Sequence, residues 1–416
     1  MKKIKKGYKQ TEIGVIPVDW EVVTFSEKFT IKNGLNKAKE FFGYGTPIVN
    51  YMDVFANSGL YKKDVQGKVF LSSQEKENYK VKIGDLLFTR TSETPKEIGM
   101  SSVVLEKIPH AVFSGFVLRA RPKDETFNNE FKKYCFRSSE VRKQIISTCS
   151  YTTRALTNGK SLSVIKVLLP PLPEQKAIAQ VLSDTDELIQ ALEQKLAKKK
   201  AIKQGAMQQL LAPKKDWEER KLGEIAKYRR GSFPQPYGLP QWYDTNNGMP
   251  FVQVYDVGKN MKLKPTTKQK ISDLAKDKSI FVKKGNVILT IQGSIGRIAI
   301  TQYDAYVDRT LLIFTDYKIP IDRMFFTYVV QEKFKIEKEN APGGIIKTIT
   351  KEELSKFDIP LPSTKKEQTE IATILSDMDK EIEQIETQLS KYKQIKQGLM
   401  QNLLTGKIRL TLDSLD

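Results

Sequence analysis

The chain has 416 residues, too many for one ordinary hydrophobic core and suited to two domains with connecting elements. Its 69 Lys and Arg residues outnumber its 49 Asp and Glu residues, and the formal net charge of +20 attracts polyanions such as nucleic acid. A lysine-rich, solvated surface is the alternative explanation. The sequence has no apolar run near the ~18 residues that span a bilayer and no signal-peptide core. We expect a soluble cytoplasmic protein without membrane segments.

Residues 1–20 are predicted to form an N-terminal arm, and residues 21–170 a first globular domain. The domain alternates short apolar runs, such as Leu86–Thr89, with Gly, Asn and Pro turns and a few helical stretches, which indicates an α+β fold. Its two cysteines, Cys135 and Cys149, are too far apart for a CxxC site. We interpret them as reduced packing residues.

Residues 171–213 are predicted to form a long helix after a proline-rich strand end. Apolar residues mostly recur at alternating spacings of four and three, a seam typical of coiled coils. A surface helix of one domain is the alternative. At a rise of 1.5 Å per residue, ~38 residues would extend about 57 Å. The predicted seam residues are Ile178, Leu182, Thr185, Leu188, Ile189, Leu192, Leu196 and Ile202.

The chain then repeats this plan, with a second α+β domain at residues 214–362, a second helix at 363–406 and a tail at 407–416. The second helix has a regular 4,3 seam from Ile371 to Tyr392. Residues 174–211 match 367–404 without a gap, and 21 of 38 positions are identical. This internal duplication predicts approximate two-fold symmetry, with the two helices paired as an antiparallel coiled coil between two tandem domains.

The duplication also makes a prediction about the N-terminal arm. Trp20 aligns with Trp217, and the segment before Trp217 follows the first helix directly. The arm should therefore pack beside the end of the second helix, near Gly406. The second copy has four residues between Pro362 and Glu367 where the first copy has none, so the start of the second helix is the least certain part of the match.

The residues needed for catalysis are missing from the sequence. His110 is the single histidine, so no imidazole pair can bind zinc. The run Asn158–Ser161 ends like a phosphate-binding loop, but Arg154 stands where that loop needs glycine. We also find no Asn/Asp-Pro-Pro-aromatic motif of amino-methyltransferases and no glycine-rich turn for S-adenosylmethionine. We predict that the chain is not an enzyme and binds no cofactor or metal.

With this architecture, the sequence resembles the specificity subunits of type I restriction–modification systems. The likeness is closest at Thr11–Trp20, at Pro171–Gln175 with the helix after it, and at Leu403–Leu410. The resemblance implies two target-recognition domains, each reading half of a bipartite site on double-stranded DNA. It also implies that two modification subunits, which methylate adenine, bind the helices, and that a translocating restriction subunit joins them.

Three pairs of aligned loops are the candidates for DNA contact. The first pair follows the strands at Leu86–Thr89 and Val287–Thr290, where Arg and Gln could make paired hydrogen bonds to guanine and adenine edges. The second pair changes chemistry between the domains, as base-reading positions would. The third keeps a cation in both domains, which suits phosphate. A solvated side chain is the alternative in each case. The candidates are Arg90, Thr91, Ser92, Lys96, Gln292, Ser294 and Arg297, then Ser114, Asp308 and Arg309, and finally Tyr151, Thr152, Arg154 and Lys347.

Two functions of other classes also fit these observations. One is a coiled-coil scaffold that carries two adaptor domains and has no role on DNA. Salt-sensitive binding to duplex DNA would argue against it. The other is a standalone DNA-binding regulator whose halves mimic a dimer on a palindrome. The divergence of the two halves, which implies two different half-sites, argues against that regulator.

Overall fold

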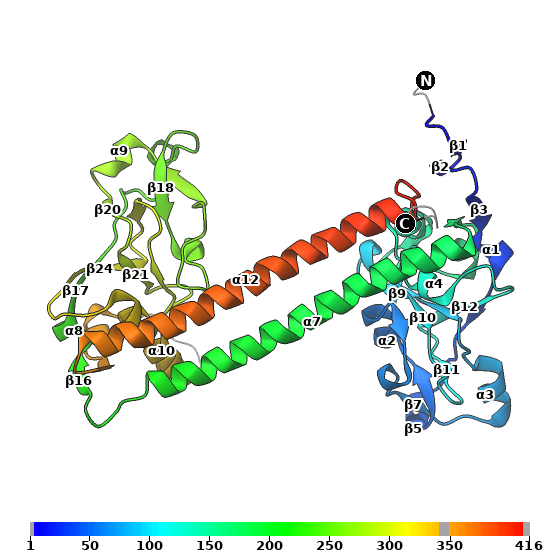
Figure 1. The fold of residues 1–416 in the computed structure, drawn as a ribbon, viewed down its shortest axis with the longest axis horizontal. Coiled ribbons are helices and arrows are strands. Elements are labelled where there is room, and N and C mark those ends of the chain that lie inside the picture. The colour runs from blue at the N-terminus through cyan, green and yellow to red at the C-terminus, as the bar shows by residue number, and fades with distance from the viewer. Residues whose placement is uncertain (1–3, 341–348, 411–416) are drawn as a thin grey trace. The chain divides into compact units, whose positions relative to one another are not determined.

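The computed structural model describes residues 4–340 and 349–410 (Figure 1). The chain divides into two units. The first unit consists of Met1–Leu192 and Gln388–Asp416, and the second of Glu193–Thr387. Each unit therefore combines one globular region with a part of both long helices. Within the described ranges, we find no helix with the length and apolar character to cross a membrane.

The first unit is built on two sheets. The larger has the strand order β4-β12-β8-β10-β6 and the smaller β11-β5-β7. The central strand β8 (Leu86–Thr89) is buried at every residue, as its apolar run predicts. The other strands are β4 (Phe29–Asn33), β5 (Phe42–Val49), β6 (Gly59–Leu60), β7 (Lys68–Val69), β10 (Ser101–Val104), β11 (Val112–Phe113) and β12 (Val117–Pro122), and the helices of this region are α1 (Phe25–Lys28), α2 (Tyr51–Ala56), α3 (Ser73–Tyr79), α4 (Asn129–Cys135), α5 (Ser139–Thr148) and α6 (Gly159–Ser163).

The second unit repeats the core of this arrangement. Its two sheets have the orders β17-β24-β21-β22 and β19-β18-β23-β20. The central strand β21 (Val287–Thr290) corresponds to β8 and is likewise buried throughout. The other elements are β17 (Ala226–Arg230), β18 (Met249–Val252), β19 (Gln269–Ile271), β20 (Ile280–Val282), β22 (Ile298–Ile300), β23 (Ala305–Val307), β24 (Leu311–Tyr317), α8 (Leu222–Ile225), α9 (Asp273–Lys276), α10 (Arg323–Asn340) and α11 (Lys351–Ser355).

Each globular region begins and ends on a pair of antiparallel strands. In the first unit β3 (Glu21–Thr24) pairs with β15 (Lys166–Leu169), and in the second β16 (Glu218–Lys221) pairs with β25 (Asp358–Leu361). A 39-residue helix follows each pair, α7 (Leu172–Leu210) and α12 (Lys365–Leu403). These strand pairs therefore mark equivalent structural boundaries in the two copies.

The two long helices begin in equivalent ways, although their sequences differ in length before the shared glutamate. Gln175 and Gln368 are each the fourth residue of their helix. Gln175 Oε1 accepts a hydrogen bond from the N–H of Asn128 at 2.8 Å, and Gln368 Oε1 accepts one from Asp322 at 2.9 Å. Pro173 stands opposite Lys366, so the connection after the strand is one residue longer in the second copy rather than four. Both helices therefore dock in the same way.

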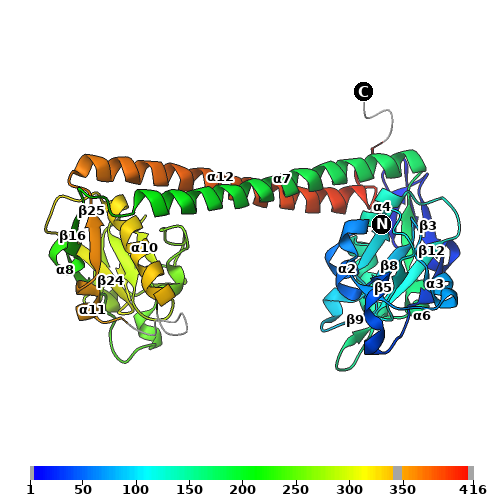
Figure 2. The ribbon, with the colours of Figure 1, turned by 90° about the horizontal axis from the view of Figure 1, so that it is seen from below.

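Within each unit, α7 and α12 run side by side in opposite directions. Asp186 near the start of α7 pairs with Lys396 near the end of α12 at 2.5 Å in the first unit. Asp379 on α12 pairs with Lys203 on α7 in the second. The same aspartates accept hydrogen bonds from Tyr134 and Tyr328, on the helices α4 and α10 that lie next to the long helices (Figure 2). The duplicated Asp residues thus join three helices in each unit.

The predicted heptad seam holds in part. In α12, Ile371, Leu375, Ile382 and Ile385 are buried as expected. In α7, Ile178 and Leu182 are buried, whereas Leu188 is 39% exposed and Ile202 is 47% exposed. The buried face of α7 passes through Ile189 instead of Leu188. The prediction for Leu188 and Ile202 was wrong. Ile189 takes the buried position in place of Leu188, because two apolar residues adjacent in sequence cannot both face the same helix.

The N-terminal arm packs where the duplication predicts. Its hairpin consists of β1 (Tyr8–Thr11) and β2 (Gly14–Pro17). The Tyr8 hydroxyl donates to the carbonyl of Gly406 at 2.9 Å. Gly406 has a φ of +68°, and a Cβ atom there would lie 2.5 Å from Pro17 Cδ. The arm therefore completes the first unit, and only glycine fits this close approach.

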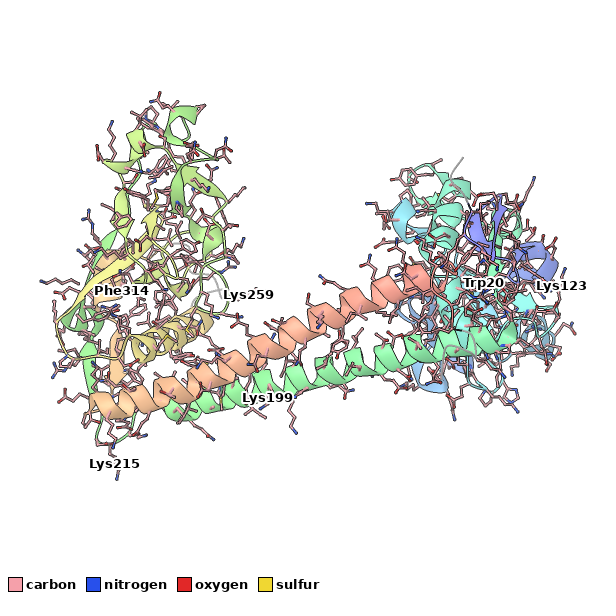
Figure 3. All side chains as sticks on the ribbon, turned by 45° about the horizontal axis from the view of Figure 1, so that its top comes forward. Trp20, Lys123, Lys199, Lys215, Lys259 and Phe314 are labelled. Atoms are coloured by element: carbon pink, nitrogen blue, oxygen red, sulfur yellow. The ribbon has the colours of Figure 1, made fainter. Side chains whose placement is uncertain are left out.

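A glutamate in the first turn of each long helix anchors the junction, and it is buried in the first unit and half-buried in the second. Glu174, 4% exposed, accepts hydrogen bonds from Trp20 Nε1 at 2.8 Å and from Arg409 Nε at 2.7 Å. Trp20, labelled in Figure 3, is fully buried. In the second unit, Glu367 accepts from Trp217 and Lys214. The geometry is the same, but the second junction is more exposed. Among the described residues both cysteines are free, as predicted.

Candidate nucleic-acid interface

A small third sheet brings two of the predicted loops of the first unit together. Its strands are β9 (Thr91–Ser92), β13 (Ser150–Tyr151) and β14 (Ala155–Leu156), in the order β13-β14-β9. Leu156 pairs with Thr91, and Ala155 pairs with both Tyr151 and Ser92. The candidates Thr91, Tyr151 and Thr152 therefore lie on one edge of the unit. Lys96 is exposed on the loop that follows β9.

Arg90 connects this edge to the remaining loop. Its backbone N–H donates to the carbonyl of Phe116 at 2.9 Å, and its Nη1 donates to the carbonyl of Gly115 at 3.5 Å. Phe116 is 62% exposed and Tyr151 is 57% exposed, so two aromatic rings face solvent near these cations. Exposed rings of this kind can stack on nucleic acid bases. Phe116 was missed because an isolated aromatic residue in a loop carries no pattern.

Arg154 forms only a weak ion pair, with Glu93. Its guanidinium lies 3.1 Å from Glu93, and both side chains are largely exposed. An exposed ion pair of this kind contributes about 0–1 kcal/mol. Arg154 can therefore exchange Glu93 for a phosphate at little cost. Lys347, its predicted counterpart in the second unit, lies outside the described residues.

Two candidates of the first unit are buried. Ser92 is 6% exposed, and its hydroxyl accepts from the N–H of Thr94 at 3.3 Å. Ser114 is 4% exposed, and its carbonyl lies where a Cβ atom on Gly34 would fall. The predicted DNA contacts from these serine side chains are therefore not supported in this conformation. Both residues shape the loops from within.

In the second unit, a threonine closes the loop that follows β21. The Thr290 hydroxyl donates to the carbonyl of Ser294 at 2.5 Å and accepts from the N–H of Arg297 at 2.9 Å. Thr89 accepts from Met100 in the same way in the first unit. Ser294 and Arg297 are exposed, and Gln292 is half-buried. Met100 and Arg297 donate to the equivalent threonines Thr89 and Thr290, so they occupy the same position, although the loop between threonine and donor is longer in the first unit. Arg297 therefore has no cationic counterpart in the first unit.

Asp308 and Arg309, adjacent in sequence, differ in exposure. Asp308 is 1% exposed, and its carboxylate accepts from the N–H of Thr310 at 3.0 Å. A DNA contact from Asp308 is therefore excluded in this conformation, and the prediction is corrected to a role in shaping the loop. Arg309 is exposed and lies 5.4 Å from the centre of the Tyr237 ring.

A polar and aromatic cluster beside Arg309 was not predicted. It contains Tyr237, Gln253 and Tyr255, of which both tyrosines are partly exposed. Tyr237 lies in a stretch from Gly231 to Pro250 that is six residues longer than its counterpart from Gly34 to Pro47. This difference in loop length was the available signal. It shows where the two copies diverged most.

Among the described residues, no three or more His, Cys, Asp or Glu side chains are grouped so that they could hold a metal ion.

The comparisons with known proteins agree with this architecture. A family model of the type I restriction modification DNA specificity domain matches residues 17–204 and 214–396. The chain belongs to this family. Its two matches correspond to the two copies that the sequence repeat defines, and the predicted resemblance is confirmed.

Individual relatives match nearly the whole chain. A protein of Methanocaldococcus jannaschii assigned as the MjaX type I restriction enzyme specificity subunit is 27% identical and is covered over 97%, with 98% of this chain aligned. The EcoBI specificity subunit of Escherichia coli is 24% identical, with 94% of this chain and 85% of that protein covered. The crystal structure of a type I restriction-modification S subunit from M. genitalium matches with a TM-score of 0.58 at 14% identity. The match covers 96% of this chain and 97% of the M. genitalium chain. The M. genitalium structure shares the fold of this chain.

Proposed function

We propose that this chain is the non-catalytic DNA-reading subunit of a type I restriction–modification complex, in which each unit recognises half of an interrupted, asymmetric site. One contrast carries the proposal. The duplication keeps the scaffold, such as the Tyr134–Asp186 and Tyr328–Asp379 hydrogen bonds. It changes the exposed loops, where Arg309 stands in place of Gly115. Two readers with different surfaces recognise different half-sites.

The candidates that are exposed or half-buried form the proposed contact surface. Arg90, Lys96 and Arg154 in the first unit, and Arg297 and Arg309 in the second, supply positive charge for phosphates or guanine edges. Thr91, Tyr151, Thr152, Gln292 and Ser294 supply the polar contacts around them. Ser92, Ser114 and Asp308 position the loops.

We propose two modification subunits as protein partners, because both helices present the same exposed sequence. Ile202 and Ile395 occupy equivalent positions and are 47% and 38% exposed. Gly205 and Gly398 follow three residues later, and a Cβ atom on either would meet no other atom within 4 Å. Glycine inside a helix costs about 1 kcal/mol relative to alanine. Because none of the described residues requires it, a partner that approaches the backbone closely explains why both copies have it.

The modification subunits would bring S-adenosylmethionine and the methyl-transfer chemistry, and a restriction subunit would bring cleavage. Because the complex acts on cellular DNA, we propose that it works in the cytoplasm. The experiment is to incubate DNA with the purified chain, with the modification partner, and with both, and to map methylated adenines. We expect methylation at one interrupted, asymmetric sequence only when both are present. Methyl transfer by the chain alone, or partner methylation that ignores the chain, contradicts the proposal.

A further inference from the structure

The side chain of Gln253 is held at both ends in the second unit. Nε2 donates to the Tyr237 hydroxyl at 2.5 Å, and Oε1 accepts from the Tyr255 hydroxyl. The backbone N–H of Gln253 donates to the fully buried carboxylate of Asp256 at 2.9 Å. A long, flexible amide is thus ordered before a ligand arrives, which reduces the entropy cost of binding.

Asp308 sets the direction of these hydrogen bonds. An ionised carboxylate can only accept, and Asp308 Oδ2 accepts from the Tyr237 hydroxyl at 3.4 Å. Burial and the charge of Asp308 raise the pKa of Tyr237, so the phenol keeps this proton at neutral pH. Since the Tyr237 hydroxyl donates its one proton to Asp308, its oxygen can only accept a hydrogen bond from Gln253. The amide NH₂ of Gln253 therefore points to Tyr237 and its oxygen to Tyr255.

This arrangement leaves Gln253 with one N–H and one carbonyl lone pair unused. Adenine offers the complementary pair in the major groove, because N7 accepts and the N6 amino group donates. Arg309 and Gln253 both contact Tyr237, since the Arg309 guanidinium lies over its ring and Gln253 donates to its hydroxyl. Within the described part of the chain no carboxylate is paired with Arg309, and a free guanidinium makes two hydrogen bonds to guanine O6 and N7.

We propose that Gln253 and Arg309 are the base-reading residues of the second unit, with Gln253 recognising an adenine and Arg309 a guanine in the major groove. Asp308, Tyr237 and Tyr255 are positioning residues, because they orient the two readers without touching the bases. The inference rests on the proposed DNA-reading function and specifies its chemistry.

The divergence of the two copies supports this assignment. The longer stretch from Gly231 to Pro250 supplies Tyr237, and Ser114 in the first unit stands where Asp308 directs the network in the second. Tyr237 and Asp308 thus have no counterparts in the first unit, where Asn50 stands at the position of Gln253 and keeps only the backbone hydrogen bond to Asp53. A reader of one half-site is expected to differ in this way, whereas a phosphate contact would be shared.

The test uses the full chain in complex with its modification partner and measures adenine methylation on DNA with randomised half-sites. Gln253→Ala should lower discrimination by about 5- to 150-fold at one adenine of the second half-site. Arg309→Ala should do so at one guanine. Asp308→Asn should lower discrimination at the same adenine as Gln253→Ala. Asparagine can donate to the Tyr237 hydroxyl as well as accept from it, so the Gln253 amide is no longer held in one orientation.

Two further variants separate reading from folding. Tyr255→Phe keeps the ring but removes the donor to Gln253, and should reduce discrimination at the adenine position alone. Lys259→Ala removes an exposed charge of the same unit, labelled in Figure 3, and should leave the selected sequence unchanged. The first half-site should be identical in every variant.

The outcomes distinguish the inference from the function beneath it. If the wild-type complex selects no sequence, the proposed function fails. If the wild type selects a site and Gln253→Ala and Tyr255→Phe reproduce its profile, the function stands and the assignment of Gln253 is overturned. An equal loss at every position would also overturn it, because that result indicates misfolding or a phosphate contact.

Discussion

Replacing Arg409 with alanine should destabilise the first unit strongly, whereas the equivalent change in the second unit should have little effect. Arg409 donates to Glu174 from Nε and Nη2 at 2.7 and 2.8 Å. These hydrogen bonds raise the pKa of Arg409, so its charge is secure. In Arg409→Ala, the carboxylate of Glu174 stays buried but loses its countercharge. Breaking such a pair from one side costs about 3–5 kcal/mol.

Lys214→Ala is the matched control. Lys214 pairs with Glu367 at 2.7 Å, but the two side chains are 48% and 25% exposed. Water replaces the lost partner there, and exposed pairs contribute about 0–1 kcal/mol. Both variants lose one positive charge next to a tryptophan and a helix-starting glutamate. They differ in the burial of the glutamate and in the two further hydrogen bonds that Arg409 donates to Asp19, at 3.0 and 2.7 Å.

The assay is hydrogen exchange of each unit under increasing denaturant, which reports their stabilities separately. Arg409→Ala should lower the free energy of unfolding of the first unit by about 3–5 kcal/mol. Adding Glu174→Gln should restore part of this loss, because the neutral amide needs no countercharge. Equal small effects of Arg409→Ala and Lys214→Ala, or no rescue by the second change, would refute the reasoning.

Three further predictions concern separate parts of the molecule. Burial lowers the pKa of Lys132 from 10.5 to about 8, so the folded state loses this proton at a lower pH than the unfolded state. The free energy of unfolding should therefore rise between pH 8 and 10.5, by about 3 kcal/mol at 1.4 kcal/mol per pH unit. Denaturation curves of Lys132→Met should lack this rise, and an unchanged rise would contradict the prediction. Gly205→Ala and Gly398→Ala should each stabilise the chain by about 0.5–1 kcal/mol and weaken binding of the modification subunit in titrations, and unchanged binding would argue against a partner there. Arg154→Ala should reduce the salt slope of DNA binding by about one unit for all sequences, while Arg297→Ala should relax one base position; identical behaviour of the two variants would show that these loops are wrongly sorted.

The sequence predicted those features that repeat along the chain. The 4,3 spacing predicted both long helices, and the match of Trp20 to Trp217 predicted that the arm packs beside Gly406. These inferences succeed because local periodicity and duplication are visible without knowledge of tertiary contacts. The seam of the first helix was harder to predict, since Leu188 and Ile189 are both apolar and only packing selects between them.

The sequence identified candidate loops for DNA contact, but it did not predict which of their side chains are exposed. Asp308 is buried because Thr310 and Tyr237 satisfy its carboxylate, and Tyr237 comes from a loop that is distant in the sequence. Gln253 follows a buried strand and has no motif around it. Its role depends on two tyrosine hydroxyls that only the fold brings to it. Long-range hydrogen bonds of this kind leave no periodic signal.

Each unit is proposed to read one half of the site. The most direct test replaces Glu21–Leu169 of the first unit with a second copy of Glu218–Leu361, exchanging the segments at their paired boundary strands. Methylated sequences are then mapped in the presence of the modification partner. Because the internal duplication predicts approximate two-fold symmetry, the chain with two identical readers should recognise an interrupted palindrome made of the second half-site. Retention of the original asymmetric site would contradict the account.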